Sequence, residues 1–467
     1  MSAAGIYYMT VLWERRGIPL LANRGNGIKK LRRAAFAAAV TVAFSMNVNA
    51  APLEDIAAET AVLMDAETGQ VLFDKNMDQR MQPASMTKIM TGLLVMENAS
   101  LDEIVTVSEE AVEFRYGVSN IALQPGEELS VDSAMYAMML PSANDAANAL
   151  AEHVSGTQAA FARLMNERAK AIGALGTSFE NSHGLPGRQH YTTAYDMALI
   201  TGEAIKNEAF LEYFGTKRKT IPATNLQAEE RPLTNLGYML LPDSLAYYPD
   251  VIGEKVGYTV PAGHTMSTVA VRDGRTLICV VMKSGADGKF YDTEKLLDYG
   301  FDAFASVSVP AEKLSGFTAK LLDAEETVGA VYFSAPGNTR MLIPAGKSET
   351  DIRYQYHIPE AVEKGSDTQA SVTLSVPAPD GDASPDIQMT IPLTASVRYD
   401  LVPPPIIERE DEPGRTAPEG DSGARSRTAL LLLVPAGILA LFLKRQMRIR
   451  GSRKRRRARI AGTRGPE

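Results

Sequence analysis

The chain is poor in the residues that build disulfides and metal centres. Its 467 residues include one cysteine and five histidines. A single cysteine excludes an intramolecular disulfide. Cys279 lies in an apolar run (275–282), where we expect a buried strand residue rather than a nucleophile. The histidines are scattered without the spacing of metal ligands, so we expect no metal and no cofactor.

The formal net charge of −8 conceals an acidic body with basic ends. Residues 51–443 hold 54 acidic and 30 basic residues. By contrast, 1–50 hold seven Lys or Arg and one acid, and 444–467 hold eleven and one. An acidic body disfavours nucleic-acid binding. The basic ends indicate a protein whose termini are handled by a membrane.

Residues 1–50 are expected to be a secretory signal with an N-terminal extension. A basic stretch (29–33) precedes a short apolar stretch (34–46) and a small-residue cleavage site (48–50). The apolar stretch is short for a membrane span, and a retained N-terminal anchor is the alternative. The mature chain is expected to begin near Ala51.

The C-terminal end is expected to anchor the protein in the cell membrane. A linker rich in Pro, Glu, Asp, Gly and Ser (402–427) leads to sixteen apolar residues (428–443) and a basic tail (444–467). Sixteen residues of helix span about 24 Å, and snorkelling of the flanking Arg427 and Lys444 would lengthen the span. The positive-inside rule then predicts a single-pass protein with a cytoplasmic tail and an extracytoplasmic body.

The body divides into a mixed α/β domain over 51–305 and a β-rich domain over 306–401. Strand-like runs occur at both ends of the first domain, with helical patterns between them. We expect the N- and C-terminal strands to share one sheet. In the second domain short β-branched runs alternate with Pro, Gly and Asp, which predicts a small all-β sandwich without catalytic residues.

A serine and a lysine three residues apart form the first candidate catalytic pair. Ser85 is expected to open a helix running to about Met96, so that its side chain and that of Lys88 share one face. A serine hydroxyl needs a base, and lysine can serve only if burial or a second cation lowers its pKa. The backbone N–H of Ser85 could form an oxyanion hole with that of Tyr258 on a later strand. Alone, the pair is equally explained by a helix N-cap and a solvated lysine.

Two later stretches could complete the site. Ser142 and Asn144 lie in a predicted break between helices, where a hydroxyl and an amide can bind a peptide and relay a proton. Lys255 begins a predicted strand and would supply the second cation. Gly257 would keep the strand edge open for an extended substrate. Taken singly, Ser142 could cap a helix and Lys255 could be a solvated strand residue.

The order and spacing of these three stretches resemble the low-molecular-mass penicillin-binding proteins, the active-site serine D-alanyl-D-alanine carboxypeptidases. The resemblance covers about 58–305 and implies a penicillin-binding/β-lactamase-like fold, followed by a β-rich domain and a C-terminal anchor. Further matching blocks lie at 63–69, 75–76, 83–91, 181–186, 190–198 and 262–265.

The resemblance also implies a role for each matching position. Ser85 would be the nucleophile that forms the acyl-enzyme, and Lys88 its general base. Ser142 and Asn144 would orient the substrate and pass a proton, and Lys255 would bind the substrate carboxylate and polarise Ser142. The implied substrate is the D-Ala-D-Ala end of peptidoglycan stem peptides, and the implied inhibitors are β-lactams.

Two positions depart from the family's pattern. The third motif is usually Lys-Thr-Gly, and here Val256 replaces the threonine whose hydroxyl helps to hold the substrate's terminal carboxylate. Losing one charge-assisted hydrogen bond costs about 1.5–3 kcal/mol. Thr259, expected on the same face of the strand, could compensate. Ala143 replaces a common glycine in the second motif, which should be tolerated.

Three functions follow, of which a D-Ala-D-Ala carboxypeptidase is the first. A weakly catalytic peptidoglycan-binding protein is the alternative that Val256 keeps open. A transpeptidase or β-lactamase on the same fold is the third, although the Glu-x-x-Leu-Asn context of class A β-lactamases is absent between the second and third motifs. His183 and His190 are expected to serve structure, because Ser85 lacks the Gly-x-Ser-x-Gly context of a histidine-based hydrolase.

Overall fold

The computed structural model describes residues 53, 56–114, 117–335, 337–366, 368–378 and 386–399. Residues Val48–Glu410 form one compact unit that contains all of them. The predicted signal (1–50) and the predicted linker, span and tail (402–467) lie outside the described residues. Within the described ranges, no helix is long and apolar enough to cross a membrane.

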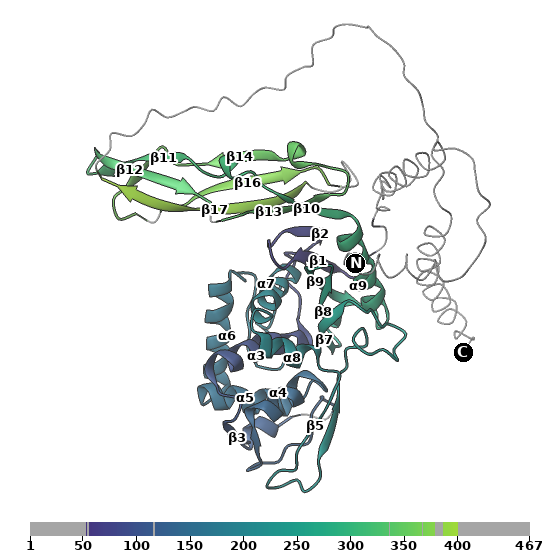
Figure 1. Cartoon of the computed structure of the whole chain (residues 1–467). Coiled ribbons are helices and arrows are strands. Elements are labelled where there is room, and N and C mark those ends of the chain that lie inside the picture. Colours follow the sequence, from purple (N-terminus) through teal and green to yellow (C-terminus); the bar gives the residue numbers. More distant parts are fainter. Residues whose placement is uncertain are drawn as a thin grey trace, which may run out of the picture. The chain divides into compact units, whose positions relative to one another are not determined.

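A five-stranded sheet forms the centre of the N-terminal domain, in the order β2-β1-β9-β8-β7 (Figure 1). Its neighbouring strands all run antiparallel. The prediction that strands from both ends of the domain share one sheet is confirmed, because β1 pairs with β9. β7 lies at one edge. The strands are β1 (Thr60–Asp65), β2 (Val71–Lys75), β7 (Val251–Thr259), β8 (Gly263–Arg272) and β9 (Arg275–Ser284).

Both faces of this sheet are buried. Along β9, Ile278 and Val280 join the core that includes the helices, whereas Leu277 and Val281 join the core on the opposite face. This alternation is the period-two pattern of a central strand. Cys279 is fully buried on the second face, as predicted, and burial raises the pKa of its thiol to about 12.

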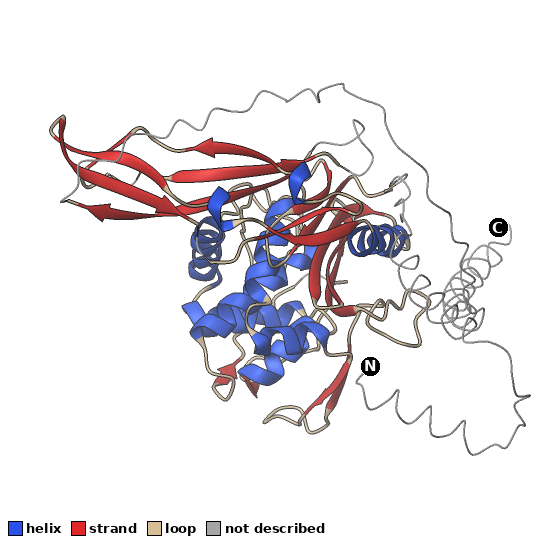
Figure 2. Ribbon diagram, turned by 45° about the horizontal axis from the view of Figure 1, so that its top comes forward, coloured by secondary structure: helices blue, strands red, loops and turns tan. Residues whose placement is uncertain are grey.

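Helices cover the two faces unequally (Figure 2). Helix α9 packs on one face, and α7 and α8 pack on the other, α8 against β7, with the remaining helices completing the core on that side. Most α3 positions are buried, because this helix runs through the middle of the helical core. The helices are α3 (Thr87–Asn98), α4 (Val131–Met139), α5 (Asn144–Ser155), α6 (Gln158–Ile172), α7 (Ala194–Ala204), α8 (Glu208–Gly215) and α9 (Gly288–Asp302).

Shorter elements surround the helical core. Two small antiparallel pairs, β3–β4 and β5–β6, project from it. They are β3 (Ile104–Thr106), β4 (Glu128–Ser130), β5 (Arg218–Ile221) and β6 (Arg231–Thr234), and the two 3-10 turns of this domain are η1 (Ala84–Met86) and η2 (Glu110–Val112).

From Phe304 onward the described chain is built of strands and two 3-10 turns. Six strands form a sheet in the order β14-β16-β17-β12-β11-β15, and β10 pairs with β13. The long strand β17 pairs first with β16 and then with β12, and so joins the two halves of the sheet. The elements are β10 (Phe304–Ser308), η3 (Ala311–Lys313), β11 (Phe317–Asp323), β12 (Glu326–Ser334), β13 (Arg340–Pro344), η4 (Glu349–Asp351), β14 (Arg353–His357), β15 (Ala361–Glu363), β16 (Ala370–Val376) and β17 (Ile387–Arg398).

A buried amide joins this β-rich region to the N-terminal domain. Gln70 donates from Nε2 to the carbonyl of Leu342 (3.1 Å) and accepts from its N–H (2.6 Å). The core on the α9 face of the central sheet continues into the β-rich region. The two parts therefore share buried apolar surface.

Candidate active site

Ser85 lies in a strained turn, not in a regular helix. We predicted a helix from Ser85, but the 3-10 turn η1 holds this residue and α3 begins only at Thr87. Ala84, immediately before Ser85, has a φ of +48°, which is unfavourable for a residue with a Cβ. Such a conformation persists only where its surroundings hold it in place.

A chain of hydrogen bonds holds this turn. The backbone N–H of Glu180 donates to Nδ1 of His190 (3.0 Å), and Nε2 of the same ring lies 2.9 Å from Oγ1 of Thr87. Because Nδ1 accepts, Nε2 carries the proton and donates to Thr87, which in turn donates to the carbonyl of Ala84 (2.9 Å). Burial lowers the pKa of His190 to about 4, so the ring stays neutral. These contacts agree with the expectation that His190 serves structure, but its partners could not be predicted, since no local pattern links these residues.

Lys88 is fully buried beside the candidate nucleophile. Its Nζ lies 3.1 Å from Oγ of Ser85, 2.6 Å from Oδ1 of Asn144 and 2.8 Å from the carbonyl of His183. Burial, assisted by the charge of Lys255, holds the pKa of Lys88 well below its usual range. A neutral amine can donate its two hydrogens to Asn144 and His183, which leaves its lone pair facing Ser85. The arrangement suits a general base.

The second and third sequence motifs meet at a serine–lysine contact. Ser142 lies between α4 and α5 with a φ of +63° and is buried. Its Oγ accepts from Nζ of Lys255 at 3.0 Å, and Lys255 also donates to the carbonyl of Val256 at 3.1 Å. Burial lowers the pKa of Lys255 to about 7, and the neighbouring charge of Glu254 opposes this shift. The structure therefore brings together residues 113 positions apart.

Gly257 lies on the edge strand, as expected, but the structure supplies a stronger reason for a glycine. A Cβ at this position would lie 2.8 Å from the backbone nitrogen of Ser85 and 2.5 Å from Oγ1 of Thr265. Only a glycine lets β7 approach the nucleophile turn this closely. The two predicted oxyanion donors, Ser85 and Tyr258, thus belong to elements that pack against each other.

The predicted position of Thr259 is wrong in one respect. Thr259 follows Val256 by three residues in a strand without a bulge between them, so the two side chains lie on opposite faces. The hydroxyl of Thr259 accepts from the N–H of Ala262 (3.2 Å) in the turn after β7. Thr259 lines the same pocket as Val256, and its contact with substrate stays a prediction.

A pocket of about 640 Å³ opens over these groups, while Lys88 and Lys255 lie buried beneath it. Exposed apolar side chains gather on its walls, as they do at recognition sites. Leu236, Tyr238, Tyr258 and Val260 are among them. The lining residues discussed as site positions from the sequence are Ser85, Ser142, Asn144, Val256, Gly257, Tyr258 and Thr259. Gly184, Leu185, Pro186 and His264 come from the matching blocks 181–186 and 262–265, and the residues that sequence reasoning missed are Gly117, Val118, Ser119, Leu236, Tyr238, Val260, Pro261, Lys289 and Phe290.

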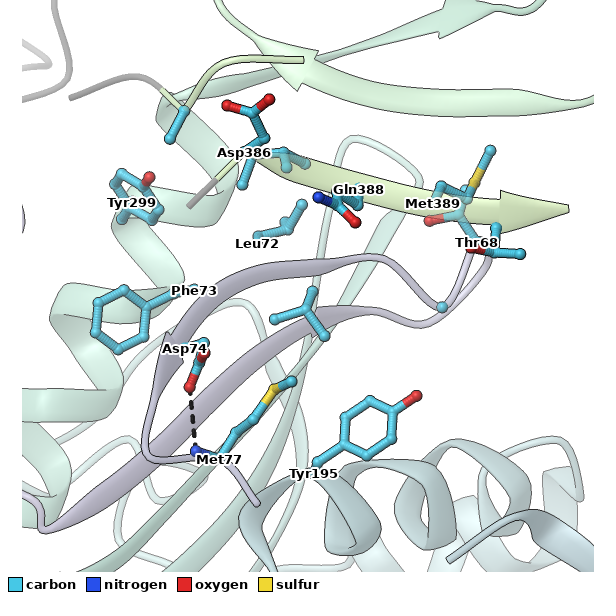
Figure 3. A pocket seen from close by; sticks show the side chains of 15 residues that line it. Thr68, Leu72, Phe73, Asp74, Met77, Tyr195, Tyr299, Asp386, Gln388 and Met389 are labelled. Atoms are coloured by element: carbon cyan, nitrogen blue, oxygen red, sulfur yellow. Dashed lines mark hydrogen bonds between the residues drawn. The ribbon is translucent and has the colours of Figure 1, made fainter. Parts of the chain in front are cut away.

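A second pocket of about 530 Å³ lies between β2 and the start of β17 (Figure 3). Leu72, Met77, Tyr195 and Tyr299 contribute to its lining. The described residues that line it include no serine, cysteine, lysine or histidine. Its described lining therefore has no serine–lysine pair, and the first pocket is the candidate active site.

A serine hydroxyl beside a buried lysine of lowered pKa defines the class of serine–lysine acyl-transfer sites. A family model described as D-alanyl-D-alanine carboxypeptidase (peptidase S11) matches residues 45–286. The chain belongs to this family.

Individual relatives agree with the family assignment. The chain is 36% identical over 255 residues to D-alanyl-D-alanine carboxypeptidase DacF of Bacillus subtilis (strain 168), a match covering 53% of this chain and 63% of that one. The match thus spans less than two thirds of this curated relative. Among solved structures, penicillin binding protein 5 from Haemophilus influenzae superposes with a TM-score of 0.57 at 26% identity, covering 73% of this chain and 98% of that one. D-alanyl-D-alanine carboxypeptidase DacD from Francisella tularensis gives 0.55 at 26% identity, covering 73% and 93%.

Proposed function

We propose that this protein is a serine-type D-Ala-D-Ala carboxypeptidase that removes the terminal D-alanine from peptidoglycan stem peptides. The observation that carries the proposal is the buried Nζ of Lys88, 3.1 Å from Oγ of Ser85. Family membership supports the reaction class, and the name of the Bacillus subtilis relative supports the substrate.

The geometry suggests which residue carries out each step of the reaction. Oγ of Ser85 attacks the carbonyl carbon of the penultimate D-alanine while Lys88 takes the hydroxyl proton. The N–H groups of Ser85 and Tyr258 bind the oxyanion as it forms. Ser142, polarised by Lys255 at 3.0 Å, passes a proton to the amine of the departing D-alanine, and the C–N bond breaks. Water then hydrolyses the ester on Ser85 and releases the shortened peptide.

β-Lactams are proposed as inhibitors, because a strained cyclic amide offers the same attack but keeps its leaving group attached. Two buried lysines suit a ligand carboxylate: Lys289 lines the pocket, and Lys255 lies beneath it, hydrogen-bonded to the lining residue Ser142. Lys289 is held by a hydrogen bond to the carbonyl of Ala286 and lies 4.1 Å above the Phe290 ring. These contacts fix a positive charge near Val256 without the hydroxyl of a threonine.

The effect of Val256 separates the carboxypeptidase from the weakly catalytic binding protein. Val256→Thr should raise kcat/KM for D-alanine release from a D-Ala-D-Ala peptide by about tenfold, because it restores one hydroxyl donor for the carboxylate. Val256→Ala, which changes the side chain without adding a hydroxyl, is the matched control.

The rate of D-alanine release by the wild type determines how the Val256→Thr result is interpreted. Fast release by the wild type with no gain in Val256→Thr would remove the support for the binding-protein alternative. Release seen only in Val256→Thr would instead favour that alternative over the carboxypeptidase.

We also propose that residues 428–443 anchor the protein in the cell membrane with its catalytic domain outside the cytoplasm. The support is the sequence pattern alone, an apolar stretch followed by a basic tail. Deleting 428–443 should move the protein from the membrane pellet to the soluble fraction on ultracentrifugation. Retention of the deleted form in salt-washed membranes would count against this anchor.

A further inference from the structure

Glu254 is a buried carboxylate with incomplete pairing, next to Lys255. Its residue exposure is 1%, and Oε1 accepts from the backbone N–H of Met239 (2.7 Å) and Leu240 (3.2 Å). Its Oε2 has no hydrogen-bond partner among the described residues. Burying a carboxylate is costly unless it is fully bonded. An apolar side chain would fill this position at a lower cost in free energy. We therefore expect the carboxylate to have a functional role.

The two amides that Glu254 binds belong to one segment, residues 235–241, which we call the pocket-wall loop. A Cβ on Gly237 would lie 2.4 Å from Cγ of Glu254, so the loop backbone rests directly on this side chain. Within the loop, the N–H of Gly237 donates to Oδ1 of Asn235 (2.8 Å). Glu254 is thus a contact through which β7 holds the loop, whose first residues are also held by the carbonyls of Lys217 and Leu140.

The pocket-wall loop carries two side chains of the active-site pocket. Leu236 and Tyr238 line it and remain 39% and 50% exposed. The Tyr238 ring pairs with Phe290 at 5.9 Å between centroids, and both rings line the pocket. Because these side chains are largely exposed, the position of the wall depends on the backbone anchorage beneath it.

Charged groups on two elements act on this carboxylate. Lys255 on β7 and Lys289 on α9 both lower the pKa of Glu254, but burial outweighs them and raises it to about 7. His264 on β8 interacts in turn with Lys289 and with Asp287. Glu254 therefore changes charge near neutral pH, and only the ionised form makes charge-assisted hydrogen bonds to the loop amides.

We propose that Glu254 is a positioning residue that fixes the pocket-wall loop, and with it an apolar wall of Leu236 and Tyr238 that binds the uncharged part of the ligand. Glu254 touches neither Ser85 nor Lys88 by any described hydrogen bond, so it should act on ligand affinity more than on the acylation step. The proposal rests on the proposed function for its choice of ligand, whereas the anchorage of the loop does not.

Hydrogen exchange on the full-length protein tests the anchorage without any activity. In Glu254→Leu, amides of the 235–241 segment should exchange about tenfold faster or more, and in Glu254→Gln, which loses only the charge, about fivefold faster. The matched control is Asp292→Asn, another buried carboxylate that accepts two backbone N–H groups, from Ala57 (3.0 Å) and Ala58 (2.8 Å), and does not line the pocket. Unchanged exchange of 235–241 in Glu254→Leu would overturn the proposal.

Acylation kinetics with a fluorescent penicillin test the consequence for the pocket. The apparent dissociation constant should rise about fivefold in Glu254→Gln, while the limiting acylation rate changes less than about twofold. Tyr238→Ala should weaken affinity without removing it, which keeps the test usable if Glu254 variants fold poorly.

Two further outcomes of the acylation experiment also test the proposals. A slower limiting rate with unchanged affinity would mean that Glu254 acts through Lys255, which overturns the proposal. A folded wild type that is not acylated at all would refute the proposed function, and hydrogen exchange would still judge the loop anchorage.

Discussion

Replacing Ser85 by alanine should abolish covalent labelling by a fluorescent penicillin and lower D-alanine release by roughly 10⁴-fold or more, as removal of a nucleophile does in serine hydrolases. The reason is that the acyl-enzyme ester forms on Oγ of Ser85, the only hydroxyl shown within hydrogen-bond distance of Lys88 in the described structure. Labelling is measured by gel fluorescence on the full-length protein.

The control separates loss of the nucleophile from loss of the fold. Ser306→Ala changes an exposed serine of β10 that is not part of the pocket lining, and it should label like the wild type. Both variants should keep the wild-type unfolding temperature. Persistent labelling of folded Ser85→Ala would place the nucleophile elsewhere.

Replacing Lys88 by arginine, which is permanently charged, should lower the acylation rate by about 10²–10⁴-fold. A guanidinium does not lose its proton at accessible pH and cannot accept one from Ser85. Lys88 can, because burial and Lys255 lower its pKa. The measurement is the acylation rate constant of each variant with a fluorescent penicillin.

The pH profile shows whether Lys88 acts as a base or as a fixed charge. The neutral amine is the active form, so the wild-type rate should rise with pH through the lowered pKa of Lys88. Removing the second cation in Lys255→Gln raises the pKa of Lys88, and the rising limb should move to higher pH. A wild-type rate in Lys88→Arg would assign Lys88 a purely electrostatic role.

Local sequence patterns were sufficient where the chemistry depends on near neighbours. The three-residue spacing predicted the contact of Ser85 with Lys88, and the contact forms although the helix starts later than expected. The apolar run predicted the burial of Cys279, and the strand patterns predicted the shared sheet. The helical spacing of about 3.6 residues and the strand spacing of about two residues are both properties of the backbone, so these patterns can be recognised in a single sequence.

Where sequence reasoning was wrong, as for Thr259, or incomplete, as for Gly257, the strand register or a packing contact between distant segments determined the arrangement. Counting along β7 places Thr259 on the face opposite Val256, so it cannot simply replace a threonine hydroxyl there. Gly257 is required because the nucleophile turn packs against its Cα, a contact between segments far apart in the chain. No local pattern contains that information.

The sequence by itself determined the candidate nucleophile, its base and the order of the three motifs, because these follow from spacing and residue chemistry. Only the tertiary structure decided how Thr87 and His190 hold the turn before Ser85, and how Glu254 holds the pocket-wall loop. It also decided the pKa of each buried lysine. Burial and long-range contacts set these properties, and both exist only once distant segments have packed together.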